Sequence, residues 1–335
     1  MGWLTILLYA LFALGALGMA WATTGAVLES LRARAILDHP NQRSSHEAPT
    51  PRGAGLAVIG VVLLTWCLQS ALSGKLTHHW PVFAAAAAIA AISWRDDLAG
   101  LGALPRLIAQ ALAVAVGMTA LPGDGLIFQG LLPGPLDTAV AALGWLWFVN
   151  LFNFMDGIDG ISGVETAAIG FGLCLVALIG GMENGLYGLT VAAAALGFLP
   201  WNWQPARIFL GDVGSVGLGY LLGWLLLGAA AEGYWAAALL LPLYYLADAT
   251  LTLFSRLRRR EPIWQAHRQH YYQRAIRRGL SHGKVVRAVM AVDALLIGSA
   301  LLSLAGDRGL IAALAIGALS VIGVLWYFRG SRGDY

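Results

Sequence analysis

Residues 213–230 read VGSVGLGYLLGWLLLGAA and contain no charged side chain. A helix of this length and hydrophobicity is long enough to cross the hydrocarbon core of a bilayer. The whole chain has the same character, because 59% of its 335 residues are hydrophobic and only 12% are charged. Soluble domains contain roughly 45–50% apolar and about 25% charged residues. The composition therefore predicts an all-α, polytopic integral membrane protein and excludes disordered, collagen-like and coiled-coil chains.

Eleven segments of the sequence are apolar enough to form membrane-spanning helices. They are 3–28, 54–72, 80–94, 105–121, 138–155, 163–180, 186–200, 213–230, 234–255, 285–304 and 309–328. The first segment has no basic residue before it, which is unlike a secretory signal peptide. Cys67 and Cys174 both lie inside apolar segments, so neither a disulfide framework nor a cysteine-ligated metal site is expected.

Basic residues are distributed unequally between the loops. If the loops after odd-numbered segments and the C-terminus lie on one side, nineteen of the 21 Lys and Arg residues lie there, and only Lys75 and Arg308 lie opposite. Loops rich in Lys and Arg remain in the cytoplasm. We therefore expect the N-terminus outside the cytoplasm and the C-terminus inside it. The net charge of +3 is too small to indicate a nucleic-acid partner.

Five polar clusters interrupt the apolar sequence, and all of them fall on the predicted cytoplasmic side. They lie at residues 38–55, 96–97, 150–160, 202–215 and 267–273. Transporters place their ionisable residues near the bilayer midplane, in broken helices. Clusters at one membrane boundary favour a reaction site. A transporter or flippase of a phosphorylated lipid or solute remains the alternative.

The residue types in these clusters favour phosphoryl transfer. Asn150, Asn153 and Asp156 recur at three-residue spacing, which places them on one helix face. Carboxylate and amide oxygens are the ligands that Mg2+ prefers. Residues 211–215 (GDVGS) are expected to form a glycine-containing loop that leads into a helix, and the N-terminus of a helix stabilises a bound anion. Arg207 can neutralise a phosphate. At a membrane boundary, these features predict one lipid phosphate substrate and one soluble substrate.

Simpler interpretations and other enzyme classes have to be compared with this one. Asp96 and Asp97 could form a solvated turn, and the histidines of 267–273 could lie in a solvated basic loop. The DGxxAR motif of CDP-alcohol phosphatidyltransferases does not follow Asp156 or Asp159. The DDxxD motif of prenyltransferases is also absent, since Gly100 occupies its third acidic position.

Taken together and in order, the motifs resemble those of the polyprenyl-phosphate N-acetylhexosamine-1-phosphate transferases, the WecA/MraY superfamily. The resemblance rests on DHPNQRSSHEAPTPRGAG (38–55), RDDLAGL (95–101), NLFNFMDGIDGISG (150–163), NWQPARIFLGDVGS (202–215) and the histidine-containing loop 267–273. Eleven segments and an outward N-terminus are similar to the WecA-like branch, whereas the MraY branch has ten.

The resemblance implies the reaction and the cofactor. Members of this family transfer a sugar 1-phosphate from a UDP-sugar to undecaprenyl phosphate, with Mg2+ or its substitute Mn2+, and release UMP. By motif position, Asp212 and Asn153 would bind the metal. Asp96 or Asp97 would be the catalytic carboxylate that binds or deprotonates the lipid phosphate. Asp156 would support the metal and the diphosphate.

The resemblance also implies substrate contacts and a setting. Asp159 would contact the uracil, and His270, a further catalytic candidate, would face the diphosphate. The other substrate-binding candidates are Asn150, Arg52, His46, Arg207 and Arg268. The expected protein is a single membrane-embedded transferase domain, 1–335, in the bacterial inner membrane. Its cytoplasmic active-site loops would be 29–53, 95–105, 150–163, 201–215 and 256–284. The product would initiate O-antigen or another cell-surface glycan.

Several positions depart from the family pattern. The usual PRGGG-like stretch reads PRGAG at 51–55, and the common HxHH motif is reduced to His270-Tyr271-Tyr272-Gln273. His267 stands where a carboxylate is frequent. Because this loop is implicated in sugar recognition, 6-deoxy sugars such as FucNAc or QuiNAc are candidates beside GlcNAc and GalNAc. Direct attack, a covalent aspartyl intermediate and a homodimer are all compatible with the sequence.

Overall fold

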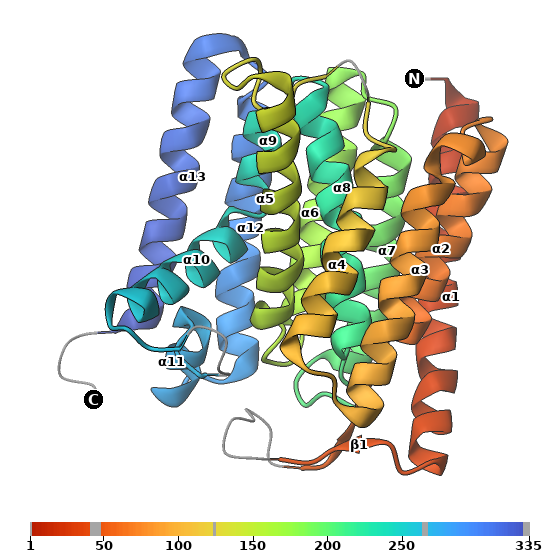
Figure 1. Ribbon diagram of the computed structural model, residues 1–335, viewed down its shortest axis with the longest axis vertical. Helices are drawn as coiled ribbons and strands as arrows, with labels where there is room; N and C mark the ends of the chain where they lie inside the picture. Colours follow the sequence, from red (N-terminus) through yellow and green to blue (C-terminus); the bar gives the residue numbers. More distant parts are fainter. Residues whose placement is uncertain (1, 41–47, 123–124, 263–266, 331–335) are drawn as a thin grey trace.

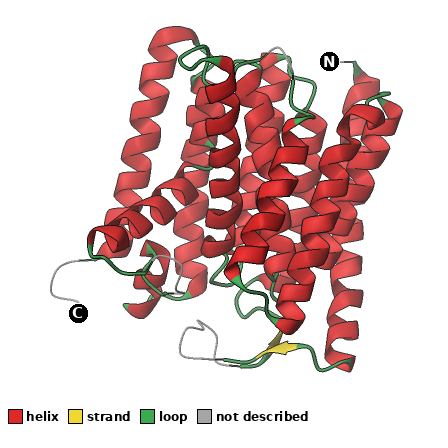
Figure 2. Cartoon of the chain, viewed as in Figure 1, coloured by secondary structure: helices red, strands yellow, loops and turns green. Residues whose placement is uncertain are grey.

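The computed structural model describes residues 2–40, 48–122, 125–262 and 267–330 as an all-α bundle with one two-stranded sheet (Figures 1 and 2). The first helices are α1 (Trp3–Ala33), α2 (Gly55–Leu72), α3 (Leu76–Ala99), α4 (Ala103–Met118), α5 (Gly134–Met155), α6 (Ile161–Gly180) and α7 (Gly185–Asn202). The others are α8 (Asp212–Ala231), α9 (Trp235–Leu240), α10 (Leu243–Arg258), α11 (Tyr271–Arg277), α12 (His282–Leu302) and α13 (Gly306–Arg329). The strands are β1 (Leu37–Asp38) and β2 (Thr50–Pro51), which pair antiparallel.

The helices lie where the apolar segments of the sequence predict them. Within the described residues, 8 helices are long and apolar enough to cross a membrane, and α4 is a shorter apolar helix. The predicted fold class, an all-α polytopic membrane protein, is therefore confirmed. The exact number of spans and their orientation stay predictions.

The prediction of a single helix over 234–255 is wrong, because this segment forms two helices. α9 ends at Leu240, and Pro242 precedes α10. Proline lacks an N–H group and its ring clashes with the preceding turn, so it ends a helix. Figure 1 shows α10 strongly inclined to the long helices of the bundle. The break places the polar residues of α10 near the loops at one end of the bundle.

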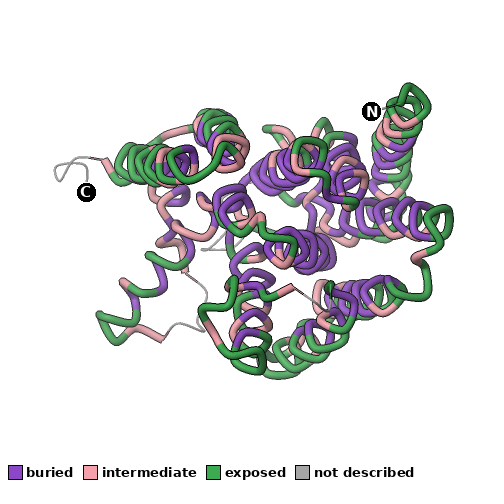
Figure 3. Tube along the Cα trace, turned by 90° about the horizontal axis from the view of Figure 1, so that it is seen from above, coloured by how far each residue is buried: buried purple, intermediate pink, exposed green. Residues whose placement is uncertain are grey.

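Helix α8 is the most enclosed of the candidate spans, because 94% of its 18-residue apolar stretch is buried. Figure 3 shows the buried helices from above. Small residues allow its neighbours to approach closely. A Cβ on Gly219 would lie 3.1 Å from the Val149 Cα of α5, and a Cβ on Gly223 would lie 2.4 Å from the Trp145 ring. Close backbone approach is how helices associate inside a membrane, where apolar burial drives little.

The polar loops gather at one end of the bundle, the lower end in Figure 1, where the sheet and α11 also lie. We call this the polar end; its described segments outside the helices are 34–40, 48–54, 100–102, 156–160, 203–211, 259–262, 267–270 and 278–281. The segment after β2 is held against the loop before α8. Phe209 donates its N–H to Pro51 O, and Gly53 and Ala54 donate theirs to Phe209 O. These bonds place Arg52 beside the start of α8.

The contact between Gly55 and Gly214 provides a test of this arrangement. A Cβ on Gly55 would lie 2.2 Å from the backbone nitrogen of Gly214, and backbone cannot move aside as a side chain can. We expect Gly55→Ala to lower the free energy of unfolding by about 1–3 kcal/mol and to reduce activity. On the same helix, a Cβ on Gly60 has no described heavy atom within 4 Å. Gly60→Ala is the matched control.

Thermal unfolding of both purified variants in detergent measures the difference. The control should be neutral or slightly more stable, because alanine favours helix over glycine. Equal stability of Gly55→Ala and Gly60→Ala would contradict the close approach of α2 and α8.

Candidate active site

The start of α8 is capped by a carboxylate from another helix. Asp97, in the last turn of α3, accepts hydrogen bonds from the backbone N–H groups of Asp212 and Val213, each at 3.1 Å. Its side chain is only 2% exposed. The first N–H groups of a helix have no partner within the helix, and its N-terminus favours a negative charge. Asp97 therefore fixes α3 against the first turn of α8.

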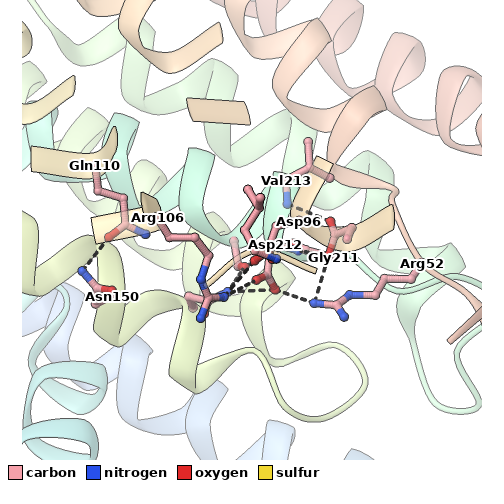
Figure 4. Close-up of polar contacts among 12 residues, drawn as sticks. Arg52, Asp96, Arg106, Gln110, Asn150, Gly211, Asp212 and Val213 are labelled. Carbon is pink, nitrogen blue, oxygen red and sulfur yellow. Dashed lines mark hydrogen bonds and ion pairs between the residues drawn. The ribbon is translucent and has the colours of Figure 1, made fainter. Parts of the chain in front are cut away.

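Asp212 lies between two arginines from distant segments (Figure 4). Arg52 Nη2 forms an ion pair with Asp212 and lies 3.0 Å from Asp97 Oδ1. Arg106 Nη1 lies 2.8 Å from Asp96 Oδ2 and 3.4 Å from Asp212 Oδ2. Burial opposes the charge on Arg52, but the carboxylates of Asp212 and Asp97 raise its pKa above the ordinary value. The three carboxylates and two guanidinium groups form one network.

The amides of α5 extend this network in two directions. Asn153 Nδ2 donates to Asp212 Oδ1 at 3.2 Å and to Ser215 Oγ at 2.8 Å. Asn150, one turn earlier, donates to Gln110 Oε1 of α4 at 2.9 Å, away from Asp212 (Figure 4). Of the two predicted amides, Asn153 touches the carboxylate cluster, and Asn150 joins α5 to α4.

This donor set fits a hard divalent cation. The Asp212 side chain is 16% exposed, and the Asn153 amide lies against its Oδ1. Mg2+ takes one or two carboxylates and completes its shell with water and phosphate oxygens. A cation held entirely by protein needs three or more ligands such as His, Cys, Asp or Glu close together. The described residues contain no such group. A site shared with a substrate is compatible with these donors.

Asp156 follows α5 and lies within the electric field of the cluster. Burial raises the pKa of its carboxyl group to about 7, and the hydrogen bond from Ser162 and the charge of Arg52 oppose that rise. The nearby carboxylates of Asp212 and Asp97 add to it. A carboxyl group with such a pKa can hold or release a proton near neutral pH.

Asp159 and Arg207 lie in loops that pack against each other. Asp159 Oδ2 accepts a hydrogen bond from Ala206 N–H at 3.1 Å, and the Arg207 guanidinium stacks over the Trp201 ring at 4.6 Å. The neighbouring Gly160 N–H donates to Asn202 Oδ1 at 2.8 Å. The loops at 156–160 and 202–207 thus form one wall of the polar end.

The histidine loop is organised by a second carboxylate cap. Asp248 of α10 is fully buried and accepts hydrogen bonds from the N–H groups of Tyr271 at 2.8 Å and Tyr272 at 3.1 Å. His270 Nδ1 lies 3.3 Å from Asp248 Oδ1, and the His270 side chain is buried. The His267 ring lies beside the His270 ring, with centroids 4.9 Å apart and planes tilted by 31°, although residues 267–270 are not helical. In the sequence, Arg268 lies between the two histidines.

A tyrosine of this loop reaches the end of α5. Tyr272 is fully buried, and its hydroxyl donates to Phe154 O at 3.1 Å. A Cβ on Gly157 would lie 2.1 Å from that hydroxyl, so only glycine fits there. Tyr272 therefore joins α11 to the loop that carries Asp156.

The structure places most of the predicted residues at the polar end but assembles them in separate groups. Asp96, Asp97, Asn153, Asp212 and Arg52 form the central network, and Asp156 lies in its field. Two flanking groups contain Asp159 with Arg207, and His270 with Arg268. His46 lies outside the described residues. Arg106, Gln110 and Asp248 could not be predicted as members of these networks, because only the fold brings them to the motif residues. Ser215 lies within the motif 211–215, but its hydrogen bond with Asn153 was not predicted.

Comparisons with known proteins identify the family of the chain. The sequence model of glycosyl transferase family 4 matches residues 79–230. A probable undecaprenyl-phosphate N-acetylglucosaminyl 1-phosphate transferase of Bacillus subtilis is 30% identical over 76% of this chain and 74% of its own length. A decaprenyl-phosphate N-acetylglucosaminephosphotransferase of Mycobacterium tuberculosis is 29% identical over 96% of this chain and 86% of its own. An undecaprenyl-phosphate alpha-N-acetylglucosaminyl 1-phosphate transferase of Yersinia pestis is 25% identical, over 82% and 77%.

Fold and site together define a multi-pass membrane protein with a carboxylate and guanidinium network at one end of its bundle. The chain belongs to glycosyl transferase family 4, the WecA/MraY superfamily, as its motifs indicate. The three relatives carry transferase names, so they support the transferase hypothesis and give no support to the transporter alternative.

The cap formed by Asp97 leads to a stability prediction. Asp97→Ala removes two hydrogen bonds to the start of α8 and leaves Arg52 with one ion-pair partner fewer. We expect the free energy of unfolding to fall by about 2–5 kcal/mol. Asp307→Ala is the control, since Asp307 is an exposed residue in the first turn of α13. Its loss should cost less than about 1 kcal/mol.

Chemical or thermal unfolding in detergent compares the two variants with the unmodified protein. A loss no larger for Asp97→Ala than for Asp307→Ala would show that the buried cap does not stabilise the contact between α3 and α8.

Proposed function

We propose that this protein transfers a sugar 1-phosphate from a UDP-sugar to undecaprenyl phosphate and releases UMP. The observation that carries the proposal is the network around Asp212, in which Asp96, Asp97, Arg52 and Arg106 converge at the start of α8. Phosphoryl transfer requires little covalent chemistry from a protein and depends on positioning and charge stabilisation. The reactions named for the relatives are of the same type.

In this proposal Asp212 and Asn153 bind Mg2+, for which Mn2+ can substitute. The bound cation would neutralise phosphate oxygens of the donor. Arg106 and Arg52, which neutralise Asp212 in the structure, are then available to the diphosphate. They carry fixed positive charge and can form paired hydrogen bonds to phosphate oxygens.

An oxygen of the lipid phosphate attacks the β-phosphorus of the donor, and the bond from that phosphorus to the bridging oxygen breaks, so UMP leaves. Asp96 and Asp97 have different environments for this step. Asp97 is fixed by the start of α8, whereas Asp96 is held by Arg106 and by the Leu101 N–H. We infer that Asp96 orients or deprotonates the lipid phosphate and that Asp97 positions Asp212. Asp156 supports the metal and the diphosphate.

The remaining candidates contact the donor. Asp159 contacts the uracil, and His270 with Arg268 faces the diphosphate. Asn150, Arg207 and, in the stretch outside the described residues, His46 complete the substrate-binding set. Residues 270–273 depart from the HxHH motif of the family, which favours a donor sugar beyond GlcNAc. The 6-deoxy sugars FucNAc and QuiNAc are therefore tested beside GlcNAc and GalNAc. Of these departures, Tyr272 bonds to the backbone of α5, so its effect on the sugar would be indirect.

The setting follows from the distribution of basic residues. We infer that the polar end faces the cytoplasm of a bacterial inner membrane, where nucleotide sugars are available and basic loops remain. The lipid acceptor would reach the site from the bilayer, and α10 presents exposed Leu251, Phe254 and Leu257 beside the buried Asp248. The lipid-linked product would initiate O-antigen or another cell-surface glycan.

A donor panel tests the proposal. Purified protein is incubated with labelled UDP-sugars, undecaprenyl phosphate and Mg2+, and the lipid phase is chromatographed. We expect a labelled lipid from at least one donor and no product in excess EDTA. We also expect a loss of at least roughly a hundredfold in Asp212→Ala, because the carboxylate that would hold the cation is removed. Full turnover in EDTA would exclude the metal, and no labelled lipid from any UDP-sugar would exclude the reaction.

Arg106 supplies a second prediction. Arg106→Ala removes a guanidinium that contacts Asp96 and Asp212, and we expect kcat/KM to fall roughly a hundredfold to a thousandfold, as for other residues that stabilise transition-state charge. Arg95→Ala removes the same charge from an exposed position on α3 and is the control. Steady-state kinetics with both substrates measure the effect. An equal, small loss in the two variants would reduce Arg106 to a general contribution to surface charge.

A further inference from the structure

The first turn of α12 reaches the loop that carries Asp159. His282 is the first residue of α12 and is buried. Its Nδ1 lies 3.3 Å from the Asp159 backbone nitrogen, which donates to it, and 3.3 Å from Asp159 Oδ1. With Nδ1 as the acceptor, the His282 side chain holds the backbone of Asp159 beside its carboxylate. His282 lies beyond the five motifs quoted above, and the chemistry of the phosphate network does not use it.

The next residue of α12 binds the opposite loop. Gly283 donates its N–H to Gln204 Oε1 at 2.7 Å, and a Cβ on Gly283 would lie 3.2 Å from the same oxygen. The 156–160 and 202–207 loops also bond directly, through Asp159 Oδ2 and Ala206 N–H. Two successive residues of α12 therefore bind the two loops that flank the proposed position of the uracil.

We propose that His282 is a positioning residue for the uridine end of the donor. It acts through Asp159, whose backbone it holds and whose carboxylate is thereby placed. In the described part of the chain, no contact joins it to the phosphate network. The inference rests on the proposed function, in which Asp159 contacts the uracil. Because His282 fixes a substrate-binding group and not a reacting one, its loss should weaken binding of the donor more than it slows the chemical step.

The two nitrogens of histidine allow a selective test. Asparagine places an amide near the position of Nδ1, whereas glutamine places its amide near Nε2. His282→Asn should therefore keep the contact with Asp159 that His282→Gln and His282→Ala lose. Lys284→Ala is the matched control, since Lys284 is an exposed residue in the same helical turn.

Two measurements are made on each variant: calorimetric binding of UMP in the presence of Mg2+, and steady-state kinetics for donor and acceptor. We expect His282→Ala and His282→Gln to weaken UMP binding and raise KM for the donor roughly tenfold, the effect of one lost positioned hydrogen bond. Their kcat and acceptor KM should stay within roughly threefold, and His282→Asn and Lys284→Ala should stay within roughly threefold throughout.

Three results would overturn the inference. His282→Ala could keep full affinity for UMP. The donor and acceptor constants could change equally together with the unfolding temperature, which would indicate a structural role only. His282→Asn could also fail as completely as His282→Gln. If the unmodified protein binds no uridine nucleotide, the proposed function itself is overturned. Because this result is seen without any His282 variant, it is distinct from a failure of the His282 inference.

Discussion

The structure depends on one buried carboxylate, Asp97, at the N-terminus of α8. An α-helix that begins inside a protein exposes N–H groups without partners, and a membrane protein has little water near its core to satisfy them. Asp97 supplies both acceptors from α3 and also pairs with Arg52. The same interaction orders α8, orients Asp212 at its first position and holds the segment after β2. Stability and the proposed metal site therefore share one interaction.

The histidine loop contains a second helix N-terminus that is capped by a buried carboxylate. Asp248, from the helix that begins after Pro242, caps α11 and lies against His270. α11 is in turn joined to α5 through Tyr272 and Phe154. Each cap connects a polar loop to the interior of the bundle, so the side chains proposed to face substrate lie near helix ends. Such mounting limits their motion, which suits a reaction in which catalysis comes from positioning.

Sequence and structure agree where the physics is local. Apolar length predicted the position of the helices. The family resemblance, and not helix spacing, assigned Asn153 and Asp212 to one site, and the structure places these two side chains in contact. The break at Pro242 could have been read from the sequence, because proline ends helices, but the surrounding residues are uniformly apolar. Arg106 could not have been identified, since a lone arginine after a turn does not reveal that α4 returns to the carboxylates. The equal appearance of Asp96 and Asp97 also concealed that one caps a helix and the other pairs with Arg106.

The central claim is that Asp97 holds α8 so that Asp212 presents its oxygens to a cation beside two arginines. Crystals or frozen grids of the protein with Mn2+ and UDP test it most directly, because the anomalous signal or density of Mn2+ locates the ion. The account predicts one Mn2+ at Asp212 and Asn153, with Arg106 turned to the diphosphate and Asp97 still bonded to the N–H groups of Asp212 and Val213. An ion bound away from Asp212, or an Asp97 that leaves α8 to bind it, would contradict the account.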